Sequence, residues 1–93
     1  MIIKYEVKPT SKFRKDLKRI KKRGYNLALL EEVVEKLACG ETLPAKYYDH
    51  QLHGNMRDFR ECHIMPDWLL VYRIDDGALI LWLMETGSHS DLF

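Results

Sequence analysis

The amino-acid sequence predicts an α+β domain. An N-terminal strand and a two-helix hairpin precede a three-strand antiparallel meander, and both helices pack on one sheet face. Apolar residues recur at helical spacing between residues 10 and 40, β-branched and aromatic residues gather between residues 59 and 85, and Gly or Pro separates the segments. With 93 residues, 46% of them apolar, residues 1–93 form one domain with a modest core.

The first strand and the first helix are separated by a proline. Residues 2–7 are rich in β-formers and predict a strand ended by Pro9, which has no backbone N–H for a ladder. Thr10 or Ser11 can cap the helix that follows, and Gly24 ends it. The apolar stripe of this helix is Phe13, Leu17 and Ile20. Basic side chains occupy most of its remaining circumference, which places the helix at the surface.

A second helix is predicted between Asn26, which can cap it, and Gly40, which ends it. Its apolar stripe is Leu27, Leu30, Val34 and Leu37. The short link between the two helices predicts an αα-hairpin.

The second half of the chain predicts a long loop and three strands. Residues 41–56 show no period, and a loop of this length with aromatic residues is typical of a functional segment. Strands are expected at residues 59–65, 68–74 and 79–85, joined by Pro66-Asp67 and by the turn Asp75-Asp76-Gly77.

The strand from residue 68 carries apolar side chains on both faces. Leu69 and Val71 lie on the face that two helices cannot cover. Either the loop and the C-terminal residues cover them, or a protein partner clamps the sheet.

Net charge conceals a separation of charge along the chain. The formal net charge of +1 gives no reason to expect a nucleic-acid partner. Residues 1–24 nevertheless hold ten basic and two acidic side chains, whereas residues 25–93 hold five basic and twelve acidic ones. The formal net charge is therefore +8 for residues 1–24 and −7 for residues 25–93, which indicates a basic face that could bind a polyanion. The candidate phosphate contacts are Lys12, Lys15, Lys18, Arg19 and Lys22 in the first helix, with Arg57, Arg60 and Arg73.

Cysteine usage and hydropathy indicate a reducing cytoplasm. Cys39 and Cys62 are too few for a disulfide framework, and no leader is recognisable. The longest apolar run, residues 78–84, is far shorter than the roughly 20 residues of a membrane span. We therefore expect a cytoplasmic protein without a membrane partner.

Four histidines, His50, His53, His63 and His89, all lie outside the predicted helices. Taken one at a time, each is typical of a solvent-exposed loop histidine or of a hydrogen-bonded strand histidine. A zinc site is disfavoured because the Cys and His residues lack the paired spacing of structural zinc ligands. The two thiols are typical of inert core residues rather than nucleophiles. We expect neither a metal nor another cofactor.

Cleavage of RNA is a reaction that these residue types can support. The 2′-hydroxyl of the substrate needs a base, the leaving 5′-oxygen an acid and the phosphate a positive cradle. Histidines and a carboxylate supply the first two. The aromatic residues that could stack on an unpaired base are Trp68, Tyr47, Tyr48 and Phe93.

Three segments resemble the YafQ branch of the RelE/ParE toxin superfamily of bacterial type II toxin–antitoxin systems. They are residues 49–52 (DHQL), 60–72 (RECHIMPDWLLVY) and 86–93 (TGSHSDLF). The resemblance implies a fold like that of microbial ribonucleases. It also implies a ribosome-dependent endoribonuclease that cuts mRNA without a metal, and an antitoxin protein that neutralises it.

The resemblance also implies residue roles. The acid–base and phosphate-handling set is His50, His63, Asp67 and His89, with Trp68 and Phe93 as aromatic walls. We expect His89 to be the general acid and His50 or His63, oriented by Asp67, to be the base; the assignments could be exchanged.

One residue departs from the family pattern. Glu85 stands where the family commonly has an arginine that would stabilise phosphate charge, so this copy could be catalytically weakened unless Arg73 or a lysine substitutes or Glu85 is itself a base. The alternative function is a non-catalytic toxin or binding module on the same scaffold, as ParE-type toxins act on DNA gyrase. Such a module has no need of the histidine set.

Overall fold

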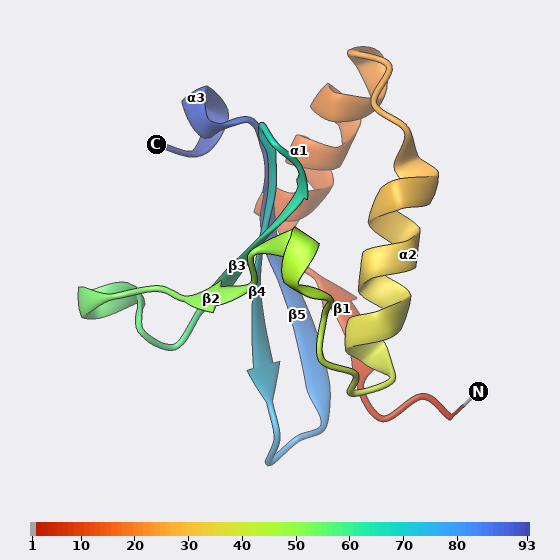
Figure 1. The fold of residues 1–93 in the computed structure, drawn as a ribbon, viewed down its shortest axis with the longest axis vertical. Helices are drawn as coiled ribbons and strands as arrows, with labels where there is room; N and C mark the ends of the chain where they lie inside the picture. The colour runs from red at the N-terminus through yellow and green to blue at the C-terminus, as the bar shows by residue number, and fades with distance from the viewer. Residues whose placement is uncertain (1) are drawn as a thin grey trace.

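The computed structural model describes residues 2–93, with a five-stranded sheet in the order β1-β5-β4-β3-β2 (Figure 1). The elements are β1 (Glu6–Pro9), α1 (Ser11–Lys22), α2 (Leu27–Ala38), η1 (Ala45–Tyr47), β2 (His50–Gln51), η2 (Gly54–Met56), β3 (Arg60–Met65), β4 (Trp68–Asp75), β5 (Ile80–Gly87) and α3 (His89–Leu92). The predicted α+β class and the antiparallel β3-β4-β5 meander are confirmed.

The N-terminal strand differs from its prediction in extent and in direction. It begins at Glu6, so Ile2 and Ile3 precede it as exposed residues. It pairs parallel with β5, which makes the sheet mixed. Pro9 is its last residue, and the next N–H, that of Thr10, donates to the Leu83 carbonyl. The proline therefore costs no ladder bond at the end of this edge strand.

Local signals set the helix ends as predicted. The Thr10 hydroxyl accepts the Phe13 N–H at 3.0 Å, and the Asn26 side chain accepts the Ala28 N–H at 3.1 Å. Gly24 and Gly40 follow the two helices with φ of 80° and 77°, the left-handed region in which glycine avoids a Cβ clash.

Three features of the loops and the C-terminal segment were not predicted. The loop over residues 41–56 contains two short 3-10 turns and β2, which adds two residues to the edge of β3. The C-terminal residues form the one-turn helix α3. In the β4-β5 hairpin, Leu79, two residues after the predicted turn Asp75-Asp76-Gly77, takes the left-handed conformation with φ of 57°.

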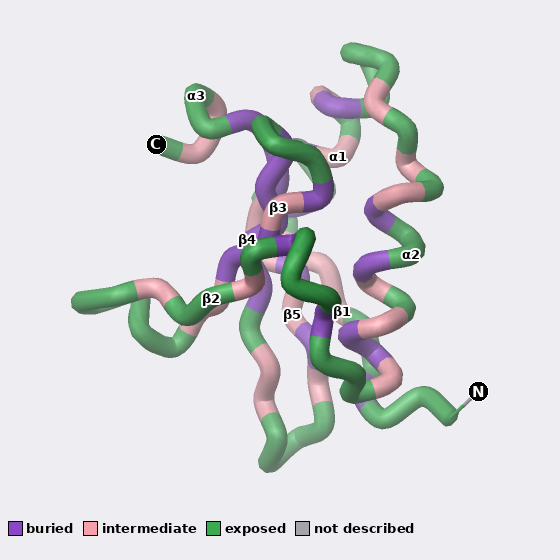
Figure 2. The backbone as a smooth tube through the Cα atoms, viewed as in Figure 1, coloured by how far each residue is buried: buried purple, intermediate pink, exposed green. Residues whose placement is uncertain are grey.

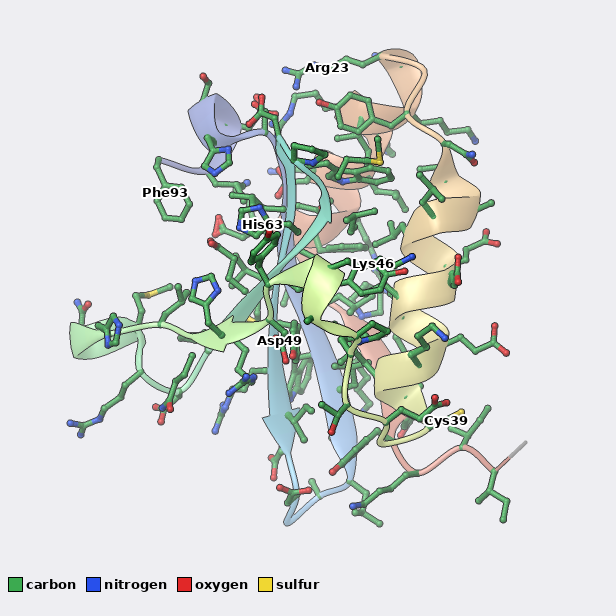
Figure 3. All side chains as sticks on the ribbon, viewed as in Figure 1. Arg23, Cys39, Lys46, Asp49, His63 and Phe93 are labelled. Atoms are coloured by element: carbon green, nitrogen blue, oxygen red, sulfur yellow. The ribbon has the colours of Figure 1, made fainter. Side chains whose placement is uncertain are left out.

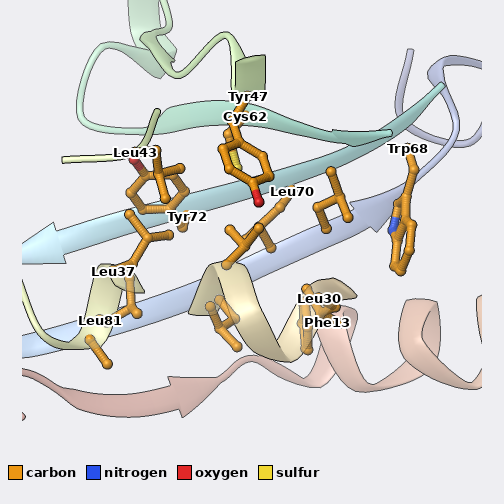
Figure 4. Packing of buried hydrophobic residues seen from close by; sticks show 14 of the residues in the cluster. Phe13, Leu30, Leu37, Leu43, Tyr47, Cys62, Trp68, Leu70, Tyr72 and Leu81 are labelled. Atoms are coloured by element: carbon orange, nitrogen blue, oxygen red, sulfur yellow. The ribbon is translucent and has the colours of Figure 1, made fainter. Parts of the chain in front are cut away.

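The core lies between the sheet and the two long helices, as predicted (Figures 1 and 2). Side chains of α1 and α2 meet those of β3, β4 and β5 there, with Leu30, Leu70 and Tyr72 among them (Figure 4). Val33 of α2 also lies fully buried there, outside the predicted stripe. In Figure 1, α3 lies on the other side of the sheet from α2. Within residues 2–93 no helix is long and apolar enough to cross a membrane.

Candidate active site

The sheet face opposite α1 and α2, which we call the open face, carries most of the candidate catalytic residues. Cross-strand pairing aligns His50, Glu61, Val71 and Glu85 in one row and His63, Leu69 and Gly87 in the next. Directly opposed residues share a face of the sheet, so the side chains of each row point the same way. Leu69 and Val71 are 0% and 2% exposed. The chain itself therefore covers the apolar residues of this face.

Three histidine rings gather over the open face. The His63 ring centroid lies 6.4 Å from that of His50 and 5.7 Å from that of His89. We call these three residues, with Glu61 and Asp67, the histidine site. His53 shares no ring contact with them. Figure 3 shows His63 and Phe93 together on this side of the sheet.

His50 is held by groups that fix its protonation pattern. Its Nδ1 lies 2.7 Å from the Tyr48 carbonyl oxygen, which can only accept, so Nδ1 carries a hydrogen. Its Nε2 lies 3.5 Å from Glu61 Oε1. Glu61 is buried, and its second oxygen has no hydrogen-bond partner among the described residues. A buried, half-satisfied carboxylate beside an imidazole is typical of a functional site.

His89 is held by Asp67. Its Nδ1 donates to Asp67 Oδ1 at 2.5 Å, and its backbone N–H donates to the same oxygen at 2.9 Å. These two bonds, the backbone one first, lower the pKa of Asp67. Nε2 of His89 is the nitrogen left to act on a substrate. The expectation that Asp67 orients His50 or His63 is thus wrong, because its carboxylate binds His89.

The α3 segment that carries His89 is anchored through Asp91. Asp91 and Ser88 form a reciprocal capping box, and Arg23 donates to both oxygens of Asp91, at 2.6 and 3.0 Å. The Arg23 guanidinium and the Ser88 N–H hold the pKa of Asp91 well below its usual range. The C-terminal end of the basic helix α1 is therefore joined to the histidine site.

The predicted phosphate contacts on α1 fall into two groups. Lys12 and Arg19 bind one carboxylate oxygen of the buried Asp16, at 2.6 and 3.0 Å. The other oxygen of Asp16 accepts the Thr86 N–H. These two cations are already engaged. The other three predicted contacts, Lys15, Lys18 and Lys22, are exposed, and no ion pair within residues 2–93 engages them.

The strand arginines separate. Arg60 donates to Asp49 at 3.2 Å, and Asp49 also accepts from the buried Tyr72 hydroxyl at 2.6 Å. Burial and Asp49 raise the pKa of Tyr72. Arg60 therefore lies on the helix side, away from His63 and already paired with Asp49, and its role as a phosphate contact stays a prediction. Arg73 is exposed on the open face, and Arg57 is exposed in the loop beyond η2.

The four aromatic candidates also separate. Trp68 and Tyr47 are buried, and the Trp68 indole N–H donates to the Thr86 hydroxyl at 2.9 Å on the helix side. The expectation that Trp68 stacks on RNA is therefore wrong. Tyr48 and Phe93 are 70% and 77% exposed, and both belong to segments next to the histidines.

The cysteines play no part in this arrangement. Burial raises the pKa of Cys62 to about 12, so its thiol stays protonated at neutral pH. Among residues 2–93, no three His, Cys, Asp or Glu side chains converge in a way that could hold a metal ion.

Glu61 is the site residue that sequence reasoning missed. The alternation that sends Cys62 toward the core sends its neighbours Glu61 and His63 to the opposite face, so a signal existed. No sequence signal predicted the pairing of His50 with Glu61, because β2 has only two residues and no recognisable period.

Comparison with known proteins places the chain in a family. Residues 5–93 match the family described as the bacterial toxin YafQ of type II toxin–antitoxin systems. The mRNA interferase toxin YafQ of Escherichia coli K12 is 32% identical over 93 residues, covering 99% of each chain.

Solved structures agree. A metal-bound toxin from Helicobacter pylori is 48% identical, with a TM-score of 0.90, over 96% of this chain and 99% of that one. The toxin in the E. coli DinJ-YafQ toxin–antitoxin complex is 33% identical, with a TM-score of 0.89, over 98% and 99%. The chain belongs to the YafQ family of toxins of bacterial type II toxin–antitoxin systems.

Proposed function

We propose that this toxin cleaves mRNA on the ribosome by metal-independent acid–base catalysis and is neutralised by a cognate antitoxin protein. The observation that carries the proposal is the histidine site. Three imidazoles lie side by side, and a carboxylate stands at each end, Glu61 beside His50 and Asp67 beside His89. A non-catalytic binding module has no need of rings held in this way.

The fixed nitrogens support a division of roles. The base, His50 or His63, takes the proton of the 2′-hydroxyl, and the 2′-oxygen attacks the adjacent phosphorus. The bond from phosphorus to the 5′-oxygen breaks, and His89 Nε2 gives that oxygen a proton. The products are a 2′,3′-cyclic phosphate and a 5′-hydroxyl, so the reaction needs no outside nucleophile.

The two carboxylates act through the imidazoles. Asp67 holds the Nδ1 hydrogen of His89 and stabilises the imidazolium form, which is the form that donates the proton. In His50 the Tyr48 carbonyl holds the Nδ1 hydrogen, and Glu61, beside Nε2, stabilises the ring once it has accepted a proton. In this scheme Asp67 and Glu61 are positioning residues.

Binding of the RNA is assigned to the free cations. Lys15, Lys18 and Lys22 are exposed on α1, whose C-terminal end is joined to α3 through Asp91. They can hold rRNA or mRNA phosphates while His89 faces the scissile bond. Arg73 is an exposed cation on the open face and is the substitute we propose for the arginine that Glu85 replaces.

An antitoxin partner is supported by the relatives, since E. coli YafQ is solved in complex with DinJ. For this chain we expect acidic side chains of the antitoxin to cover the exposed α1 lysines. Co-expression with the product of the neighbouring gene should give a single complex by gel filtration. Two separate peaks would contradict this part of the proposal.

The catalytic proposal is tested with purified toxin that has first been dialysed against EDTA. The toxin is then added to ribosomes programmed with a short mRNA, in a buffer whose Mg²⁺ keeps the ribosomes intact. Cleavage by the wild type and a loss of about 100-fold or more in His89→Gln are expected, since a general acid contributes about 10²–10⁴-fold. His53→Gln, at a histidine outside the site, is the matched control. Equal cleavage of free mRNA would contradict the ribosome requirement. Loss of activity in the EDTA-dialysed toxin, restored by adding a metal back, would contradict the metal-independent mechanism.

A further inference from the structure

A hollow of about 650 Å³ adjoins the histidine site. It is lined by Lys46, Tyr48, His50, His63, Ile64, Met65 and Pro66. The acid–base scheme uses only the two histidines of this wall. The remaining residues come from η1 and the residue after it, and from the end of β3 and the proline after it. The scheme leaves them without a role.

Tyr48 is the unusual residue of this hollow. Its backbone is left-handed, with φ of 48°, a conformation that is strained for a residue with a bulky side chain. Its ring is nevertheless 70% exposed, so burial does not offset the strain. The ring meets His63 edge to face, with centroids 5.8 Å apart, and the Tyr48 carbonyl holds His50. The turn therefore fixes one aromatic face beside the site.

The end of β3 supplies the hollow with an apolar side chain and with peptide groups that no other strand pairs within residues 2–93. The Met65 side chain is 50% exposed there, and a thioether packs well against aromatic rings. The β2-β3 ladder ends at Glu61, so the outer edge of β3 beyond it is unpaired within residues 2–93. Unpaired N–H and C=O groups can bond the edge of a base.

We propose that this hollow binds one unpaired nucleobase next to the scissile phosphate, with Tyr48 as its stacking surface. The proposal rests on the proposed function, since the ribose of the bound nucleotide must lie at His50 and His63. A flat aromatic face, an apolar wall and a free strand edge match the faces and the edge of a base. Phe93, the other exposed aromatic residue, remains for the neighbouring nucleotide.

The test combines a change in the protein with a change in the RNA. Ribosomes carry a short mRNA whose A-site codon has an abasic residue at each of its three positions in turn. Tyr48→Asn removes the ring but keeps a residue that tolerates φ near 50°, and Tyr48→Phe keeps the ring. Leu79→Asn, at the other left-handed residue, is the matched control. Circular dichroism and the midpoint of thermal unfolding confirm folding.

For the wild type, an abasic residue at one codon position should slow single-turnover cleavage about tenfold. Tyr48→Asn should cut intact mRNA about tenfold more slowly and be indifferent to that abasic residue. Tyr48→Phe and Leu79→Asn should match the wild type. The subsite would be overturned if Tyr48→Asn cut intact mRNA at the wild-type rate. It would also be overturned if the abasic residue slowed Tyr48→Asn as much as it slows the wild type. A slowing by Tyr48→Asn that is the same on every mRNA would also overturn it and would indicate a protein contact.

A second measurement separates the subsite from catalysis. A non-cleavable mRNA carries 2′-deoxyribose at the cut and the fluorescent base 2-aminopurine at the sensitive position, or at each position in turn if nothing is cut. Stacking on Tyr48 should quench its fluorescence in the wild type and in Tyr48→Phe but not in Tyr48→Asn. Quenching without cleavage would leave the subsite standing and remove the proposed function. Cleavage without Tyr48-dependent quenching would leave the proposed function standing and overturn the subsite.

Discussion

Glu85 offers the most direct test of how the open face handles charge. Glu85 lies on β5 and pairs with Val71 of the neighbouring strand β4. Val71 in turn pairs with Glu61 of β3. The phosphate gains negative charge in the transition state. If it lies above Val71, the Glu85 carboxylate is on one side of it and the Glu61 carboxylate on the other. Glu85→Gln removes one negative charge with little change in shape, and Glu85→Arg reverses it. Both should speed cleavage.

The size of the effect follows from the strand spacing. Neighbouring strands are about 4.8 Å apart, so a phosphate above Val71 lies about 7 Å from the Glu85 carboxylate. Two unit charges at that distance interact by about 2.4 kcal/mol at an effective dielectric constant of 20 and by about 0.6 kcal/mol in water. Glu85 is half-buried, so a value near 1.4 kcal/mol applies. That value corresponds to about tenfold in rate for Glu85→Gln and about 100-fold for Glu85→Arg.

The assay is single-turnover cleavage of ribosome-bound mRNA at low and high salt, with Glu41→Gln, an exposed glutamate beyond α2, as the matched control. The gain from Glu85→Gln should shrink as ionic strength rises, because salt screens the repulsion. An unchanged rate would refute the placement of the phosphate beside Glu85. A slower rate would show that Glu85 itself takes part as a base.

Three further outcomes are expected. Asp16→Ala leaves the Thr86 N–H without its partner and should lower the free energy of unfolding by about 2–3 kcal/mol, measured in urea. Asp91 has a lowered pKa, so it stabilises the fold above the ordinary carboxyl pKa of about 4; the advantage of the wild type over Asp91→Asn should be full at pH 7 and shrink as the pH falls below 4. An alkylating reagent should modify Cys39 before unfolding and Cys62 only after it, as mass spectrometry can show; early modification of Cys62 would contradict the raised thiol pKa.

Local signals predicted the fold well, and long-range pairings escaped them. Cap residues, glycines and apolar spacing located α1, α2 and the meander because each acts within a few residues. The parallel pairing of β1 with β5 joins Glu6 to Ile80, and no local pattern encodes it. The one-turn helix α3 is too short to show a period. It owes its form to the Ser88–Asp91 capping box and to Arg23.

The site residues were predicted more fully than their contacts. Three of the four histidines, His50, His63 and His89, lie together, and Asp67 binds one of them. Asp67 binds His89 rather than His50 or His63, because α3 turns back over the end of β5 and brings the His89 backbone N–H to it. Arg60 alternates away from the histidines on β3, onto the side where Asp49 and Tyr72 bind it. Strand alternation predicts the face of a residue but not its partner.

The chemical ends of the cut mRNA test the central claim most directly. Wild-type toxin, dialysed against EDTA and then added to programmed ribosomes in Mg²⁺ buffer, should leave a 2′,3′-cyclic phosphate on one fragment and a 5′-hydroxyl on the other, and His89→Gln should abolish both. Fragments with a 3′-hydroxyl and a 5′-phosphate, or unchanged cleavage by His89→Gln, would contradict acid–base transfer at the histidine site.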